Sequence, residues 1–305
     1  MSLRKHLINL HLRLFEKPHL ARCKDPSKLR ASFDTKAKWL FHPPRGSRFE
    51  NSALNHGGAD VPALWVRARN TREGPVILYL HGGGYVYGSP KSYSAMLAQL
   101  SAKTGLPACL PDYRLAPEHA FPAAFEDALT GYMALSDHPG GVVIGGDSAG
   151  GGLALALLAK IIALGLPKPK GTFAFSPLTD MTFSSDSFAD NARSDVVLPA
   201  QGAGEMVAMY LRDADPRDPR ASPLFADFTG APPVWLAVGD TEILLDDSRN
   251  IATVMHNQGV EVTLLEARNL SHVWPLFHGY LPESRQTLDT LAQWIKALSP
   301  PTGGN

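Results

Sequence analysis

Cysteine is scarce in this sequence: its 305 residues include two, Cys23 and Cys109. Two cysteines offer no metal-binding spacing, and a chain of this length can bury enough apolar surface to need no disulfide. The sequence therefore gives no sign of a metal centre, and we expect a reducing compartment.

An excess of either charge is also lacking. Lys and Arg together number 29, as do Asp and Glu, and blocks of like charge are absent. Neutralisation of phosphates supplies most of the non-specific affinity for nucleic acids. A neutral chain without a basic stripe is therefore not expected to have a nucleic-acid partner.

Long hydrophobic runs are missing as well, so no integral membrane segment is expected. Polar side chains also interrupt any signal-peptide core at the N-terminus: Arg4, Lys5, His6, Asn9, His11 and Arg13. We therefore expect a cytoplasmic protein, with export by a signal-independent route as the alternative.

Leucines recur at helical spacing in the same stretch, at Leu3, Leu7, Leu10 and Leu14. This pattern predicts an amphipathic helix that ends before Pro18. We expect its apolar side to pack against the rest of the protein, and a helix lying on a membrane surface is the alternative.

From about residue 60, strand patterns alternate with helix patterns. Strands are predicted at 61–69, 76–80, 107–111, 142–144, 172–175, 234–238 and 260–265. The clearest helices are predicted at 92–104, 121–135, 149–164 and 282–298. The alternation predicts an α/β fold with a mostly parallel sheet covered by helices on both faces. Residues 181–218 break the rhythm and are interpreted as an insertion between two strands.

A serine motif stands between a predicted strand and a predicted helix. Residues 146–150 read Gly-Asp-Ser-Ala-Gly, a weak pattern alone, but placed here in the strand–turn–helix setting of a nucleophile elbow. Gly146 and Gly150 leave room for the sharp turn that such an elbow requires. Ser148 is therefore the predicted nucleophile. A phosphate-binding loop is disfavoured, because the Walker and dinucleotide spacings are missing.

Three glycines follow His81 directly after the strand predicted at 76–80. Consecutive glycines let backbone N–H groups approach a substrate oxygen, and HGGG-type loops form the oxyanion hole of lipases and esterases. We assign the predicted oxyanion hole to the N–H groups of Gly82, Gly83 and Ala149.

Together these motifs resemble those of the hormone-sensitive-lipase-like esterases, α/β-hydrolases marked by an HGGG loop. The resemblance extends from about Val76 to Leu298 and includes Asp-Tyr-Arg-Leu-Ala-Pro-Glu at 112–118 and Ser-His-Val-Trp-Pro at 271–275. It implies the α/β-hydrolase fold with a small helical cap. It also implies that segment 112–118 is structural and supports the site.

The catalytic histidine of such a fold follows the nucleophile and the acid along the chain. His272 lies in the loop after the strand predicted at 260–265, and an apolar stretch follows it. His256 falls in a helical stretch before that strand, and His278 lies further along and is the weaker candidate. His272 is therefore the predicted general base.

Four carboxylates compete for the role of the acid after the strand at 234–238: Asp240, Glu242, Asp246 and Asp247. The resemblance implies an acid, three residues and then Asp, a spacing that Glu242 fits. Asp240 does not fit it, because Leu244 stands where the Asp is expected. Glu242 is the predicted acid and Asp240 the alternative. Asp246 and Asp247 are interpreted as capping the helix that follows and complementing its dipole.

The motifs thus predict a serine carboxylesterase that acts through an acyl-enzyme without a metal or organic cofactor. The resemblance implies short- to medium-chain acyl esters as small-molecule substrates. An amidase or peptidase with the same triad, and a non-catalytic ligand receptor on the same fold, are the alternatives.

Further expectations concern organisation. The predicted division is a cap segment at 1–45, hydrolase core at 46–180, a cap insertion at 181–218 and core again at 219–305. Pocket side chains are predicted at Tyr85, Met206, Tyr210 and Trp274, and further candidates are Met181, Phe183, Phe188 and Met209. A homodimer is expected through the edge strand at 260–265.

Overall fold

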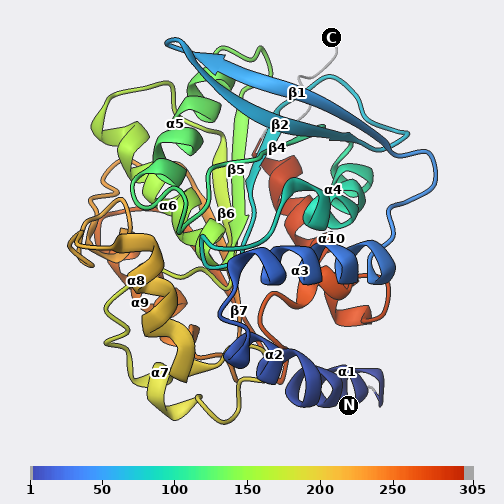
Figure 1. Ribbon diagram of the computed structural model, residues 1–305. Helices are drawn as coiled ribbons and strands as arrows, with labels where there is room; N and C mark the ends of the chain where they lie inside the picture. Colours follow the sequence, from blue (N-terminus) through green and yellow to red (C-terminus); the bar gives the residue numbers. More distant parts are fainter. Residues whose placement is uncertain (1–2, 299–305) are drawn as a thin grey trace.

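The computed structural model describes residues 3–298, which form one eight-stranded sheet (Figure 1). The strands lie in the order β1-β2-β4-β3-β5-β6-β7-β8. β2 runs antiparallel to both of its neighbours, β1 and β4, and the strands from β4 to β8 in this order are parallel. Their bounds are Arg48–His56 (β1), Ala59–Arg67 (β2), Val76–Leu80 (β3), Ala108–Pro111 (β4), Val142–Asp147 (β5), Gly171–Phe175 (β6), Val234–Gly239 (β7) and Val262–Ala267 (β8). The predicted mostly parallel α/β sheet is confirmed.

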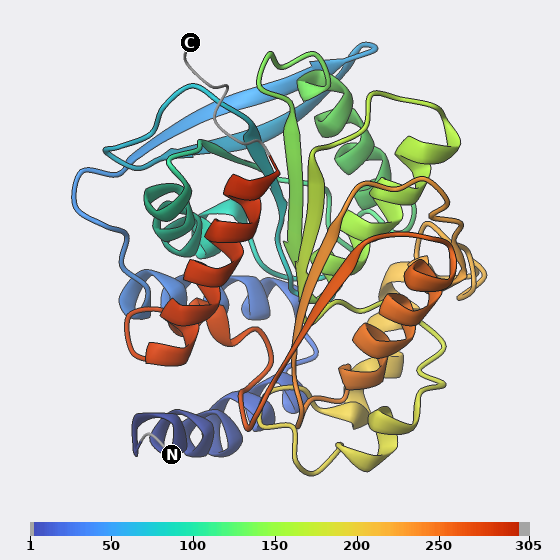
Figure 2. The same cartoon turned by 180° about the vertical axis from the view of Figure 1, so that it is seen from behind.

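Helices cover both faces of the sheet (Figure 2). On one face lie α4 (Pro90–Thr104) and α10 (Pro282–Ala297), and on the other α5 (Ala123–Leu135), α6 (Ser148–Ala163) and α9 (Leu245–Asn257). Side chains of a strand point alternately to the two faces. In β3, Leu78 and Leu80 join the apolar layer beside α5 and α6, whereas Ile77 and Tyr79 join the layer beside α4 and α10.

The sequence patterns did not predict β1 and α3. β1 pairs with β2 across a turn at Gly57 and Gly58, but its side chains are exposed except for Leu54, so it shows no hydrophobic alternation. Helix α3 (Pro26–Leu40) begins at Asp25, whose carboxylate accepts the N–H groups of the first turn. It buries little apolar surface, and its sequence therefore looks like a polar connection.

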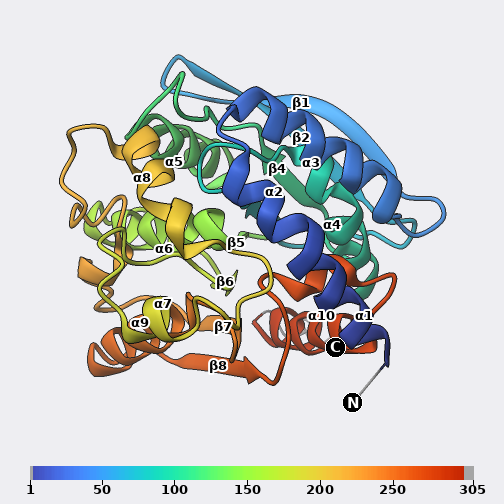
Figure 3. The same ribbon diagram turned by 60° about the horizontal axis from the view of Figure 1, so that its bottom comes forward.

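The carboxyl ends of the parallel strands meet at one edge of the sheet. At this edge lie α1 (Leu3–His11), a π-helical turn η1 (Leu12–Glu16), α2 (Lys17–Arg22) and α3 (Figure 3). Beside them lie the elements of segment 181–218, which are α7 (Asp186–Asp190), the 3₁₀ turn η2 (Ala200–Gly202) and α8 (Ala203–Leu211). Two further 3₁₀ turns are η3 (Pro223–Phe225) and η4 (Trp274–Phe277).

The N-terminal helix departs from its prediction in two ways. It continues past Pro18, because this proline stands in the first turn of α2, where its missing N–H costs nothing. The expected packing of its leucines is wrong: Leu3, Leu7, Leu10 and Leu14 are 74%, 58%, 53% and 57% exposed. Within residues 3–298, none of the helices combines the length and apolar character that crossing a bilayer requires.

Candidate active site

Ser148 stands at the sharp turn between β5 and α6. Its φ is +53°, a strained conformation for a residue with a side chain. The two glycines of the motif are needed for space: a Cβ on Gly146 would lie 2.2 Å from the carbonyl oxygen of Gly150, and one on Gly150 would lie 2.2 Å from that of Leu80. The turn has the form that the motif predicted.

The serine, the histidine and the glutamate come together from three loops. His272 Nε2 lies 2.9 Å from Ser148 Oγ, and His272 Nδ1 lies 2.6 Å from Glu242 Oε2. Ser148 follows β5, Glu242 follows β7 and His272 follows β8, and the carboxyl ends of these strands lie at the same edge of the sheet. An ionised Glu242 accepts a hydrogen bond from the Nδ1–H of His272. This tautomer leaves Nε2 free to accept a hydrogen bond from the serine hydroxyl.

The Glu242 carboxylate is buried and held on its other side. Its Oε1 accepts hydrogen bonds from the N–H of Gly239, at 2.6 Å, and from the hydroxyl of Ser176, at 2.8 Å. Ser176 Oγ also accepts the N–H of Val273, at 3.3 Å. Ser176 was not predicted, although its position directly after β6 placed it at the same sheet edge as the triad loops.

The competing carboxylates point elsewhere. Asp240 Oδ1 accepts the N–H of Asn269, at 2.7 Å, so the alternative acid is occupied in a turn. Asp246 and Asp247 lie in the first turn of α9, as expected for acids that complement its dipole. Their expected capping role is wrong, because the N-cap residue is Leu244 and neither carboxylate makes a capping hydrogen bond. Asp247 is buried and accepts the N–H groups of Thr179 and Asp180. Asp246 accepts the N–H of Ser187 in α7 and ion-pairs with Arg249. Both residues tie α9 to the segment after β6.

The electrostatics of His272 favour its protonated form. Burial lowers the pKa of the imidazole, but the charge and hydrogen bond of Glu242 oppose this and, with Asp195 and Asp147, raise the pKa of His272 above its ordinary value. Asp195 is itself buried beside this loop and accepts the N–H of Ile243 through Oδ2, at 3.0 Å. This environment would therefore stabilise an imidazolium formed by proton transfer from Ser148.

The glycine loop corrects one predicted donor. The N–H of Gly82 donates to Asp147 Oδ1, at 2.9 Å, and the same oxygen accepts the hydroxyl of Tyr79, at 2.8 Å. Gly82 is therefore not available to a substrate oxygen. Among the described residues, the N–H groups of Gly83 and Gly84 have no acceptor. Asp147, the second residue of the serine motif, thus fixes the loop; burial raises its pKa to about 7.

Segment 112–118 supports the glycine loop. The Tyr113 ring stacks on His81 with centroids 4.3 Å apart, and its hydroxyl donates to the His81 carbonyl, at 2.6 Å. Glu118 receives two hydrogen bonds from Arg30 of α3, which also donates to the carbonyls of Val86 and Ala116. These contacts join the N-terminal segment to the loop that carries the glycines.

The other candidate histidines lie outside this arrangement. His256 is exposed on α9. His278 is buried with its ring centroid 6.5 Å from that of Phe41, and neither ring nitrogen has a partner among the described residues.

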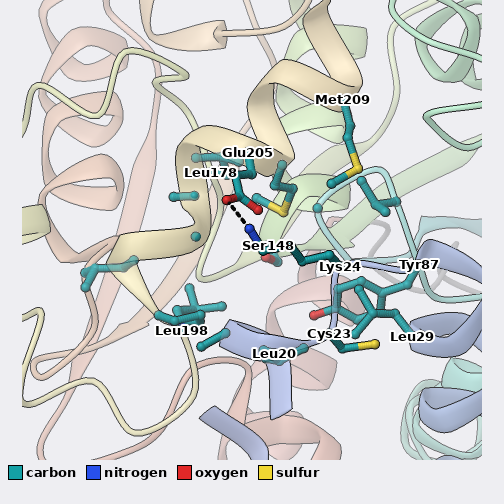
Figure 4. Close-up of a pocket in the computed structure, with 18 of the residues that line it drawn as sticks. Leu20, Cys23, Lys24, Leu29, Tyr87, Ser148, Leu178, Leu198, Glu205 and Met209 are labelled. Atoms are coloured by element: carbon teal, nitrogen blue, oxygen red, sulfur yellow. Dashed lines mark hydrogen bonds and ion pairs between the residues drawn. The ribbon is translucent and has the colours of Figure 1, made fainter. Parts of the chain in front are cut away.

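Two chambers meet at Ser148. The first lies between α8, the N-terminal segment and the loops after β6 and β7, and its apolar lining includes Leu20, Leu178, Phe183, Leu198, Met206, Met209, Ile243 and Leu244 (Figure 4). In its wall, Lys24 Nζ lies 2.7 Å from Glu205 Oε1, which links the N-terminal segment to α8. The second chamber is lined by His272, Val273, Leu276 and Phe277 on one side and by α1 to α3 on the other.

Of the predicted pocket residues, Met206 lines the first chamber, as do the further candidates Phe183 and Met209. The assignments of Tyr85, Tyr210 and Trp274 are wrong. Tyr85 and Tyr210 are buried and stack on each other beneath the chamber, with centroids 3.8 Å apart. Trp274 is buried beside α10 and donates to Thr287. Met181 and Phe188 do not line the chambers either.

Comparisons with known proteins agree with this geometry. Residues 77–276 match the family model described as alpha/beta hydrolase fold. An acetyl-hydrolase from Streptomyces hygroscopicus is 36% identical over 84% of this chain and 90% of its own length. A crystal structure of an esterase from the bacterial hormone-sensitive lipase family has a TM-score of 0.91 and 34% identity, covering 98% of this chain and 99% of that one. The structure of EstE5 soaked with p-nitrophenyl butyrate has a TM-score of 0.90 and 36% identity, with the same coverage.

The chain belongs to the α/β-hydrolase fold family, among the hormone-sensitive-lipase-like esterases. It is a serine carboxylesterase, an enzyme that hydrolyses carboxylic esters. The resemblance on which the sequence prediction rested is confirmed.

Proposed function

We propose that Ser148, His272 and Glu242 form the catalytic triad and that hydrolysis proceeds through an acyl-enzyme. Ser148 Oγ attacks the ester carbonyl while His272 Nε2 takes its proton, and the imidazolium then protonates the departing alcohol. In the second step His272 removes a proton from water, which attacks the acyl-enzyme. The bond between the acyl carbon and Ser148 Oγ then breaks, the imidazolium returns its proton to Oγ, and the acid is released. The observation that carries the proposal is the continuous hydrogen-bonded chain from Ser148 through His272 to Glu242.

The oxyanion is bound by the N–H groups of Gly83, Gly84 and Ala149. Support comes from the free N–H groups of the two glycines and from the position of Ala149 in the first turn of α6, directly after the nucleophile. N–H groups at a helix N-terminus have no acceptor within the helix, so that of Ala149 can stabilise negative charge.

The substrate is a short- to medium-chain acyl ester held under a cap. The cap comprises residues 1–45 and 181–218, and the core comprises 46–180 and 219–305, of which residues 1–2 and 299–305 lie outside the described part of the chain. The first chamber holds the acyl chain, because its lining is apolar and excludes His272. The second holds the alcohol, because His272, which protonates the leaving oxygen, is in its wall. The names of the acetyl-hydrolase and the butyrate-soaked esterase support short acyl groups.

Replacement of the nucleophile tests the triad. Ser148→Ala should lower kcat/KM for p-nitrophenyl butyrate by at least about 10⁴-fold, because no other group can form the acyl-enzyme. Asp240→Asn is the matched control in the loop of the acid and should stay within about threefold, since its amide oxygen can still accept the Asn269 N–H. Full activity of the Ser148→Ala enzyme would refute the assignment.

The assembly belongs to the same proposal: a homodimer forms through β8, which is the edge strand of the sheet. Edge strands present unpaired N–H and C=O groups to a second strand. Light scattering after size-exclusion chromatography should give twice the chain mass, and Thr263→Arg on an exposed position of β8 should give the monomer. A monomeric parent protein would rule out this interface.

A further inference from the structure

The N-terminal helical segment packs on the enzyme with its polar side. Four side chains spaced by four residues form one polar row along α1, η1 and the start of α2: Lys5, Asn9, Arg13 and Lys17. Each donates to a main-chain carbonyl, and the acceptors are Arg268, Asn269 and Ser194 for the first three and Ala192 and Asp195 for Lys17. These carbonyls belong to the loop before His272 and the loop after α7.

The opposite side of the same helix carries an apolar row in solvent. We call Leu3, Leu7, Leu10 and Leu14 the leucine row; all four are more than half exposed, and the neighbouring Phe15 is 63% exposed. A helix of a globular protein normally buries its apolar stripe and exposes its polar one. Here the polarity is reversed except at Leu12, which is 6% exposed, so the stability of the enzyme does not account for the four exposed leucines.

Charge identifies the chemistry of the partner. Between Leu3 and Lys24 the chain has six Lys and Arg residues and one acid, Glu16, which is ion-paired with Lys36 at 2.6 Å. The whole chain is neutral, so this segment carries a local excess of positive charge. Lys5, Arg13 and Lys17 bind neutral carbonyls of the enzyme and Lys24 pairs with Glu205, whereas Arg4 and Arg22 are exposed. A basic helix with Leu and Phe on its outer side complements an anionic lipid surface. A two-fold contact between two copies would bring the same cations together.

The row also ends at an entrance to the site. His11, Phe15 and His19 line the second chamber, whose wall includes Ser148 and His272. Phe15 therefore connects the exposed apolar row to the chamber beside the catalytic base. An ester dissolved in a lipid layer under the helix would have an apolar path to that chamber.

We propose that the leucine row binds an anionic lipid surface and that esters carried in this surface enter the second chamber. The binding stands on the reversed helix alone, whereas the delivery of esters rests on the proposed function. The two parts are therefore tested by separate measurements.

Binding is measured by flotation with vesicles of phosphatidylcholine containing 30% or no phosphatidylglycerol, a composition chosen to vary the surface charge. The full-length enzyme should float with the anionic vesicles, and less with neutral ones or in high salt. The triple variant Leu7→Gln, Leu10→Gln, Leu14→Gln should bind at least about tenfold more weakly. Its folding should be unaffected, because the substituted side chains are exposed. The control is Phe49→Gln on β1, an exposed aromatic at the opposite end of the molecule from α1 (Figure 1).

Activity separates the two parts. With p-nitrophenyl butyrate in solution, the triple variant should match the parent enzyme within about twofold. Hydrolysis of p-nitrophenyl decanoate, a medium-chain ester that partitions into the anionic vesicles, should fall with binding. A parent enzyme that floats but hydrolyses neither ester would refute the proposed function and leave binding intact. Three results would overturn the lipid surface as the partner. They are a parent enzyme that does not float, a triple variant that floats as well as the parent, and a parent dimer that the triple substitution dissociates when neither protein floats.

Discussion

At the residue scale, the Glu242 carboxylate decides how His272 behaves. The carboxylate holds the Nδ1 proton and raises the pKa of the imidazole against the effect of burial. Ser176 and the N–H of Gly239 keep the glutamate in place by occupying its other oxygen. The glutamate therefore has both an orienting and an electrostatic role, and the two have separate kinetic consequences.

The acid limb of the pH profile tests this role. The base works when neutral, so kcat/KM should fall as the pH drops through the pKa of His272, with a midpoint above about 6.5, the ordinary value. Glu242→Gln should lower the rate by about 10²–10⁴-fold. It should also move the midpoint to lower pH, because only Asp195 and Asp147 then oppose the effect of burial on the pKa of His272. Initial-rate assays between pH 5 and 9 measure both the loss of rate and the shift of the midpoint. An unshifted midpoint would contradict the assignment of the acid.

At the scale of elements, α3 is attached to the loop that carries the proposed oxyanion donors. Arg30 makes this attachment. Its Nε donates to the Val86 carbonyl at 2.8 Å, and one terminal nitrogen donates to the Ala116 carbonyl at 2.7 Å. It also pairs with Glu118 at 2.7 Å. A polar helix that buries little apolar surface is thus held by hydrogen bonds to the part of the core that it covers.

Replacement of Arg30 should loosen this attachment. Arg30→Met leaves two carbonyls without their donor and should cost about 1.5–3 kcal/mol of unfolding free energy, measured by urea denaturation. The matched variant Glu118→Gln keeps both carbonyl contacts and removes only an ion pair that is partly exposed, so it should cost less than about 1 kcal/mol. Equal losses in the two variants would show that the ion pair, and not the carbonyl contacts, holds α3.

At the scale of the whole molecule, buried ionisable groups of opposite kinds balance each other. Burial raises the pKa of Asp147 and of Asp247 to about 7, so their contribution to stability is lost as the pH rises from about 4 to 7. Burial lowers the pKa of His81 and of His278 to about 4, so stability is lost as the pH falls from about 6.5 to 4. The stability contributions of the two carboxylates and of the two histidines therefore change in opposite directions over the same range of pH.

The parent enzyme should therefore show little change in Tm between about pH 4.5 and 6.5. Asp247→Asn removes one carboxylate and keeps an oxygen that can accept the Thr179 and Asp180 N–H groups, so its Tm should rise relative to that of the parent as the pH increases. Differential scanning fluorimetry across this range measures the difference. The exposed Asp137→Asn serves as the control, and parallel curves for Asp247→Asn and the parent would contradict the balance.

Most of the sheet and the serine turn could be predicted because their causes are local. Buried strands such as β3 are short apolar runs, and the turn at Ser148 requires glycines on both sides, whatever lies further along the chain. β1 and α3 were missed for the converse reason. Their few buried side chains leave no periodic pattern, and contacts with β2 and with Glu118 hold them instead.

The sequence by itself determined which loops meet at the site, since the order of parallel strands brings their carboxyl ends to one edge. Only the tertiary structure decided which groups in those loops are available. The Asp147 carboxylate accepts the N–H of Gly82, and the Asp240 carboxylate accepts the N–H of Asn269. It also turned the leucines of α1 outward, because carbonyls about 180 or more residues away bind the polar row. These outcomes depend on hydrogen bonds between distant segments, and no local pattern records such partners.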